Sequence, residues 1–159
     1  YLEWADAYQE NQITIVYETM WNSTRKMAEA IAGGIREVDK DVNIKLFNTA
    51  LSDKNDIITE MFKSKAILVG CSTVNKSIMH GTAGLLGMIK GIGFKNKKAA
   101  AFGSYGWGGE SVPMITDALK ESKLEVVNDG LKIIWNPDDE ELEQCKEFGR
   151  EFGMGVRLE

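Results

Sequence analysis

The sequence predicts an α/β fold in which five parallel strands form one doubly wound sheet, with helices on both faces and the strand order 2-1-3-4-5. Two observations support this prediction. Five short apolar segments recur along the chain, and a segment of helical character lies between each of them and the next. At 159 residues the chain suits one domain that can bury a core without disulfides or metals.

The predicted strands and helices alternate along the whole chain. The strands are Ile13–Tyr17, Val42–Phe47, Ala66–Cys71, Lys98–Phe102 and Leu131–Trp135. The helices are Thr24–Val38, Asp53–Lys63, Thr82–Lys90, Gly109–Ser122 and Asp138–Phe152. Apolar residues at positions 27, 30, 31 and 35 give the first helix one apolar face. Ser52 and Asp138 are residue types that commonly begin a helix, and they support the second and the fifth.

Residues 1–12 are predicted to be a linker from a preceding domain, and residues 13–159 to be the folded domain. Tyr1–Tyr8 is rich in aromatic residues and does not open at methionine, while Gln9–Gln12 is polar, as a junction between domains would be. A trimmed terminus is the alternative interpretation.

Charge and hydropathy exclude several classes of protein. The formal net charge of −5 leaves no basic stripe for a nucleic-acid backbone. No apolar run approaches the roughly 20 residues needed to cross a bilayer, so no membrane segment is expected. Cys71 and Cys145 lack the spacing of a metal site, and we interpret both as packing residues in a reducing, cytoplasmic setting.

The segment between the first strand and the first helix is predicted to bind a phosphate group. Its hydroxyl- and amide-bearing residues stand before a helix N-terminus, where unpaired N–H groups and the helix dipole favour an anion. These residues are Thr19, Asn22, Ser23 and Thr24. The segment lacks the Gly-Lys-Ser/Thr ending of a nucleoside-triphosphate loop and the Gly-x-Gly-x-x-Gly of a dinucleotide turn, so a monophosphate fits better. A helix cap at Ser23 or Thr24 beside an ordinary turn is the alternative.

Two further loops are predicted to reach the same edge of the sheet. The loop Cys71–Gly81 offers backbone amides and the Asn75 side chain, which suit the ring nitrogens and carbonyls of a ligand. The loop Phe102–Glu110 is rich in glycine and holds Tyr105 and Trp107, which offer flat faces to a flat ligand. A glycine-rich turn with its aromatic residues folded onto the core is the alternative for this loop. Together the three loops indicate a site for flavin mononucleotide (FMN).

The first and third loops carry motifs that resemble those of a known family. The run Thr19-Met20-Trp21-Asn22-Ser23-Thr24 is similar to the Ser/Thr-x-Thr-Gly-x-Thr loop of the flavodoxin-like family, with Trp21 and Asn22 in place of the middle threonine and the glycine. Combined with Phe102-Gly103-Ser104-Tyr105-Gly106-Trp107, it looks like the flavodoxin domain of flavodiiron proteins, also called A-type flavoproteins. The resemblance runs from about Ile13 to Phe152.

This resemblance implies that FMN is bound by residues of all three loops. Those assigned to the phosphate are Thr19, Met20, Asn22, Ser23 and Thr24, and those assigned to the isoalloxazine ring are Ser72, Thr73, Val74, Asn75, Ser104, Tyr105, Gly106 and Trp107. Gly108 completes the third loop, and Trp21 is the alternative to Trp107 as the residue that covers the ring. No catalytic side chain and no metal ligand is assigned, because the flavin carries the redox chemistry.

The resemblance also implies a function, which is to pass electrons from a reduced protein donor to the di-iron centre of a flavodiiron oxygen or nitric oxide reductase. The donor would be a rubredoxin-like protein or a reductase. In that family the iron lies in a preceding metallo-β-lactamase-like domain that is absent from this sequence, and the full-length protein is expected to be a homodimer or homotetramer. A free-standing flavodoxin and an FMN-dependent quinone reductase are the alternatives. A phosphoryl-accepting receiver domain is disfavoured, because Glu18 stands nearly alone as an acid after the first strand.

Overall fold

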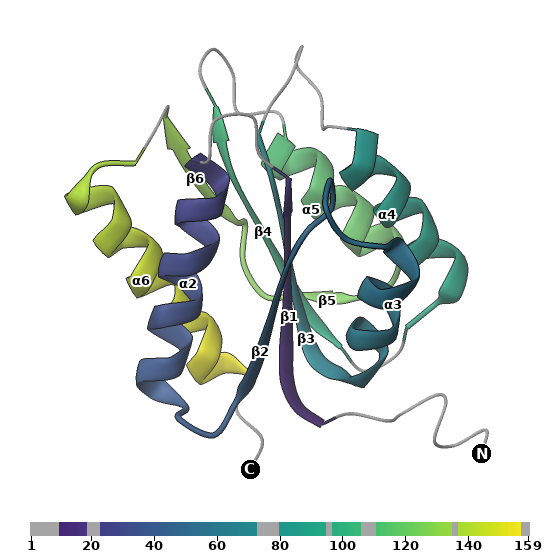
Figure 1. The fold of residues 1–159 in the computed structure, drawn as a ribbon, viewed down its shortest axis with the longest axis horizontal. Coiled ribbons are helices and arrows are strands. Elements are labelled where there is room, and N and C mark those ends of the chain that lie inside the picture. Colours follow the sequence, from purple (N-terminus) through teal and green to yellow (C-terminus); the bar gives the residue numbers. More distant parts are fainter. Residues whose placement is uncertain are drawn as a thin grey trace.

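A parallel sheet of six strands forms the centre of the molecule in the computed structural model, which describes residues 10–18, 23–72, 80–94, 97–105, 111–134 and 137–156 (Figure 1). The strands are β1 (Glu10–Glu18), β2 (Asn43–Asn48), β3 (Ser64–Cys71), β4 (Lys98–Tyr105), β5 (Glu125–Val126) and β6 (Leu131–Ile134). Their order is β2-β1-β3-β4-β5, and β6 also pairs with β4. The predicted parallel sheet and its strand order are therefore confirmed.

The last position of the sheet differs from the prediction, because two short strands occupy it instead of one. Lys98 pairs with β3 and with β5, and Phe102 pairs with β3 and with β6, so β5 and β6 lie on the same edge of β4. A turn separates them, in which Gly130 has a φ of +92° and its N–H donates to Asn128 Oδ1 over 2.8 Å. A Cβ on Gly130 would stand 2.5 Å from the Val112 side chain, so only glycine allows this approach.

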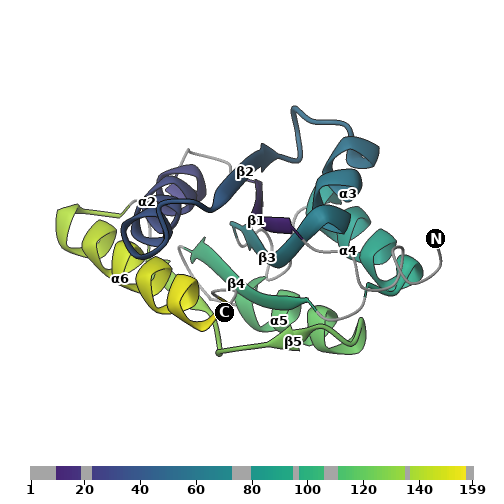
Figure 2. The same ribbon diagram turned by 90° about the horizontal axis from the view of Figure 1, so that it is seen from below.

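Five helices cover the two faces of the sheet in the described part of the chain (Figures 1 and 2). They are α2 (Ser23–Val38), α3 (Lys54–Lys63), α4 (His80–Ile92), α5 (Ser111–Glu121) and α6 (Asp139–Gly155). The helices α2 and α6 lie side by side on one face, and α3, α4 and α5 lie on the other. All five helices were predicted; the C-terminal ends of α2 and α3 are as predicted, and the other ends differ by one to three residues.

Two helix starts are set by aspartate side chains. Asp53, not the predicted Ser52, begins α3, because its carboxylate accepts a hydrogen bond from the Asn55 N–H over 2.7 Å. Asp138 begins α6 as predicted, and it forms a capping box with Glu141, in which each side chain accepts from the other residue's backbone N–H. In the structure β1 begins at Glu10, whereas the sequence predicted Ile13.

Alternating residues of the central strands fill the two halves of the core. Ile13 and Ile15 of β1 pack toward α2 and α6, whereas Val16 packs toward α3, α4 and α5. This alternation is the two-residue period of a strand, and burial on both faces accounts for the nearly continuous apolar runs in the sequence. Cys71 and Cys145 are buried in these clusters, as predicted for packing residues. Among the described residues no helix has both the length and the apolar character to span a membrane.

Candidate cofactor-binding site

Four buried hydroxyl groups from three separate segments of the chain meet at the carboxyl edge of the sheet. Ser23 and Thr24 begin α2, Ser72 follows β3 directly, and Ser104 lies near the end of β4. The Thr24 Oγ1 atom lies 2.8 Å from Ser72 Oγ and 3.1 Å from Ser104 Oγ. The Ser104 Oγ atom also lies 2.9 Å from Ser23 Oγ and 3.2 Å from Ser72 Oγ. We call these residues the hydroxyl cluster; each is at most 7% exposed.

The hydroxyl cluster lies at the point where the doubly wound sheet changes direction. Helix α2 follows β1 on one face of the sheet, and α4 follows β3 on the other. The crevice between the carboxyl ends of these neighbouring strands is where ligands of such folds bind. The structure thus confirms that residues from three separate segments come together at this edge.

The electrostatics of the hydroxyl cluster suit a small anion. The first turn of α2 contains no acidic residue, so no carboxylate within that turn competes for its unpaired N–H groups. The positive end of the α2 dipole lies at the same N-terminus and also favours an anion. Neutral hydroxyls beside a helix N-terminus form a donor set that fits a phosphate monoester, which needs several short hydrogen bonds and no metal.

Glu18 is a buried carboxylate at this edge to which the sequence analysis assigned no role. It ends β1 and is 8% exposed. Its Oε1 atom accepts a hydrogen bond from the Thr82 N–H over 2.8 Å and another from Thr82 Oγ1 over 2.9 Å. Glu18 therefore caps the N-terminus of α4. The sequence signal for it was an acid at the end of a buried strand, without any indication of its partner.

A close contact fixes the start of α5 against β3. The Ser111 hydroxyl donates to the Cys71 carbonyl oxygen over 3.1 Å. A Cβ on Gly103 would stand 2.4 Å from the same oxygen, so glycine is needed for β4 to pass this carbonyl. The first residue of α5 and a residue of β4 therefore both lie against the end of β3.

Five of the predicted site residues lie in the described part of the chain. Ser23, Thr24, Ser72 and Ser104 form the hydroxyl cluster, and Tyr105 is partly exposed at the end of β4. The others lie outside the described residues and stay predictions: Thr19, Met20, Trp21, Asn22, Thr73, Val74, Asn75, Gly106, Trp107 and Gly108.

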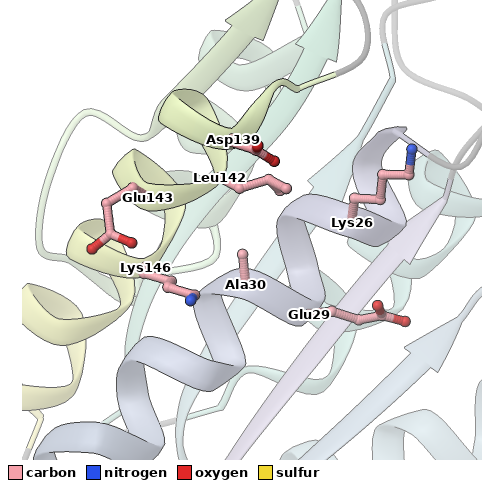
Figure 3. A pocket seen from close by; sticks show the side chains of 7 residues that line it. All are labelled: Lys26, Glu29, Ala30, Asp139, Leu142, Glu143 and Lys146. Carbon is pink, nitrogen blue, oxygen red and sulfur yellow. The ribbon is translucent and has the colours of Figure 1, made fainter.

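A groove of about 470 Å³ between α2 and α6 is a separate feature (Figure 3). Its lining residues are Lys26, Glu29, Ala30, Asp139, Leu142, Glu143 and Lys146. Figure 3 shows charged side chains of both signs around the small Ala30 side chain. None of the four clustered hydroxyls lines the groove. The groove is lined by three carboxylates and two ammonium groups, and this balance of charge does not favour binding of an anion.

A doubly wound sheet with a helix N-terminus and buried hydroxyls at its switch point defines the class of α/β domains that bind a phosphate-bearing ligand. The family model for flavodoxin matches residues 15–149. The chain therefore belongs to the flavodoxin family, which confirms the predicted resemblance.

The chain is also similar in sequence to curated relatives. The chain is 51% identical over 152 residues to the anaerobic nitric oxide reductase flavorubredoxin of Escherichia coli O1:K1 / APEC, covering 96% of this chain and 32% of the relative. The chain is also 51% identical to the protein of the same name from Klebsiella pneumoniae, and the match covers 31% of the length of that protein. The chain thus spans about a third of the length of the curated relatives it matches.

Solved structures show the same fold. The rubredoxin oxygen:oxidoreductase of Desulfovibrio gigas superposes with a TM-score of 0.88 at 31% identity, over 94% of this chain and 37% of that one. The flavodiiron protein of Giardia intestinalis superposes with a TM-score of 0.88 at 27% identity, over the same shares. An archaeal flavodoxin superposes with a TM-score of 0.81 at 28% identity, over 92% of this chain and 99% of that one.

Proposed function

We propose that this chain is an FMN-binding electron-transfer domain. The observation that carries the proposal is the hydroxyl cluster, in which residues from three separate segments of the chain meet beside the N-terminus of α2. Membership in the flavodoxin family supports FMN as the ligand. A helix N-terminus with neutral hydroxyls matches the phosphate of FMN, and the donor set therefore fits this cofactor.

The residues of the site would bind and orient the cofactor. Ser23 and Thr24, with the N–H groups of the first turn of α2, would hold the phosphate. The segments that follow Ser72 and Ser104 would flank the isoalloxazine ring and exclude water from it. When bound, FMN supplies the capacity to accept and release one or two electrons, so no catalytic side chain is needed.

We further propose that the domain works as part of a longer oxidoreductase. The proteins to which it is similar are named flavorubredoxin, rubredoxin oxygen:oxidoreductase and flavodiiron protein, and all are much longer than this chain. The electron donor would be a rubredoxin-like protein or a reductase, and the acceptor a di-iron centre in a metallo-β-lactamase-like domain that reduces oxygen or nitric oxide. The complete protein would assemble as a homodimer or homotetramer.

A free-standing electron carrier or quinone reductase is the second candidate. The observation in its favour is that the chain superposes on nearly the whole length of a flavodoxin. A turnover assay distinguishes a quinone reductase from an electron-transfer domain. A quinone reductase would oxidise a nicotinamide cofactor with a soluble quinone, whereas an electron-transfer domain would accept electrons only from a protein donor.

Titration with FMN tests the proposed function. We expect the purified chain to retain one FMN per chain through gel filtration and to show flavin absorption bands. The variant Thr24→Val keeps the side-chain shape but removes the central hydroxyl of the cluster, and it should bind FMN about tenfold more weakly, since one hydrogen bond to a charged group contributes roughly 1.5 kcal/mol. Ser122→Ala removes a buried hydroxyl at the end of α5 and serves as the matched control. A wild-type chain that does not bind FMN would contradict the proposal.

A further inference from the structure

Ser104 is a buried hydroxyl at a position where its strand otherwise carries apolar side chains. Ala100 and Phe102, the alternate residues before it in β4, pack into the core on the side of the sheet that α2 and α6 cover. The two-residue period of a strand places the Ser104 side chain on the same side, and Ile133, its partner in β6, also packs there. Ser104 is only 4% exposed. Burying a hydroxyl costs free energy unless it is hydrogen-bonded, so the partners of Ser104 explain why a serine stands here.

Ser104 connects the other three members of the hydroxyl cluster. Its Oγ atom lies 2.9 Å from Ser23 Oγ, 3.1 Å from Thr24 Oγ1 and 3.2 Å from Ser72 Oγ. The family resemblance assigned Ser104 to the isoalloxazine ring. Two of its three contacts are instead with the residues that begin α2, so the Ser104 hydroxyl is directed toward the N-terminus of that helix.

The number of protons in the hydroxyl cluster limits what each hydroxyl can donate. The four hydroxyls carry one proton each, and the four contacts between them use one proton each. An anion offers only acceptor atoms, so binding it at the N-terminus of α2 requires Ser23 and Thr24 to turn their protons toward it. The protons of Ser72 and Ser104 then remain, and they suit the two shortest contacts. One of these joins Ser72 to Thr24 over 2.8 Å, and the other joins Ser104 to Ser23 over 2.9 Å.

We propose that Ser104 is a positioning residue for the phosphate half of the cofactor site, an inference that rests on the proposed function. Its hydroxyl donates to Ser23 Oγ and leaves the Ser23 proton for the phosphate. A serine side chain has three staggered rotamers, so a contact that fixes one of them in advance should strengthen binding about threefold. A hydroxyl that accepts a hydrogen bond is also polarised into a better donor. Ser104 acts through Ser23 and need not touch the phosphate itself.

A double-mutant cycle tests whether Ser104 acts through Ser23. We would measure the affinity of Ser104→Ala, Ser23→Ala and the double variant for FMN and for riboflavin, which has the same ring and no phosphate. Ser104→Ala should weaken FMN about threefold and leave riboflavin unchanged. Ser23→Ala removes a hydrogen bond to a charged group and should weaken FMN about tenfold. In the Ser23→Ala background, Ser104→Ala should have no further effect.

Two additional variants support the interpretation of the cycle. Ser122→Ala removes a buried hydroxyl that donates to the Ala118 carbonyl in α5, and it is the matched control. Ser104→Cys keeps the size of the side chain but donates only weakly, so its FMN affinity should fall between those of wild type and Ser104→Ala. Circular dichroism and thermal unfolding of each variant without ligand report on the fold.

Three results would overturn the inference. In the first, Ser104→Ala or, where that variant does not fold, Ser104→Cys binds FMN as tightly as wild type. In the second, riboflavin is weakened as much as FMN, which would indicate a role in the ring half of the site or in the fold. In the third, Ser104→Ala weakens FMN equally with and without the Ser23 hydroxyl, so the two residues act independently. Failure of the proposed function gives a different result, since the wild-type chain would then bind neither ligand.

Discussion

Alanine substitutions at two adjacent glycines of α2 should change stability in opposite directions. Gly33 has no heavy atom within 4 Å of the place where a Cβ would lie. At Gly34 the same atom would stand 2.0 Å from the carbonyl oxygen of Lys146 in α6. Both residues lie in one helix and neither is at its end, so the helix propensity gained from alanine is the same at the two positions.

The magnitudes follow from these distances. Alanine in place of glycine inside a helix is favourable by about 0.8 to 1 kcal/mol, and Gly33→Ala should gain this amount. An ordinary contact at Gly34 requires 3.4 Å or more, so α2 and α6 would have to separate by 3.4 − 2.0 = 1.4 Å. The obstacle is backbone and not a flexible side chain. We therefore take the overpacking cost at the upper end of its range, about 3 kcal/mol, which leaves Gly34→Ala destabilised by roughly 2 kcal/mol.

Urea unfolding measures both effects, and thermal unfolding provides a second measure. For a domain of this size about 1 kcal/mol corresponds to a shift of roughly 2 to 4 °C in Tm, so Gly33→Ala should rise by this amount and Gly34→Ala should fall by about 4 to 8 °C. Equal shifts of the two variants, or a stabilised Gly34→Ala, would refute the close approach of α2 to α6.

Three further predictions concern buried or capping side chains. Burial lowers the pKa of Lys97 from 10.5 to about 8, so the unfolded chain binds this proton more tightly. The free energy of unfolding should therefore rise between about pH 8 and pH 10.5. Urea unfolding at several pH values should show a smaller rise in Lys97→Met, and a rise equal to that of wild type would contradict the assignment to Lys97. Asp138→Ala should lower the free energy of unfolding by about 1 kcal/mol, because the capping box with Glu141 is lost; an unchanged urea midpoint would contradict this. Burial raises the pKa of the Cys145 thiol to about 12, and Cys71 is also fully buried, so neither should react with a thiol reagent at pH 8 before urea unfolds the chain.

Much of the fold could be predicted because its signals are local. Apolar runs and helical spacing identify strands and helices from neighbouring residues alone, and the alternation of the two restricts the topology to parallel arrangements with few possible orders. The site followed from the same logic. Ser72 follows β3, Ser104 lies near the end of β4, and Ser23 and Thr24 begin the helix that follows β1. The carboxyl ends of parallel strands meet at one edge of the sheet.

The features that could not be predicted depend on residues far apart in the chain. Gly130 interrupts the last strand because its backbone passes close to Val112 and Ala101, and no pattern around Gly130 reveals those neighbours. Glu18 and Thr82 are 64 residues apart, and their contact exists only because α4 packs beside the end of β1. Local spacing thus accounts for the elements and for the edge at which the four clustered hydroxyls meet. Long-range packing accounts for the two short strands at the edge of the sheet and for the contact between Glu18 and Thr82, since a hydrogen bond or a steric limit requires both partners to be in place.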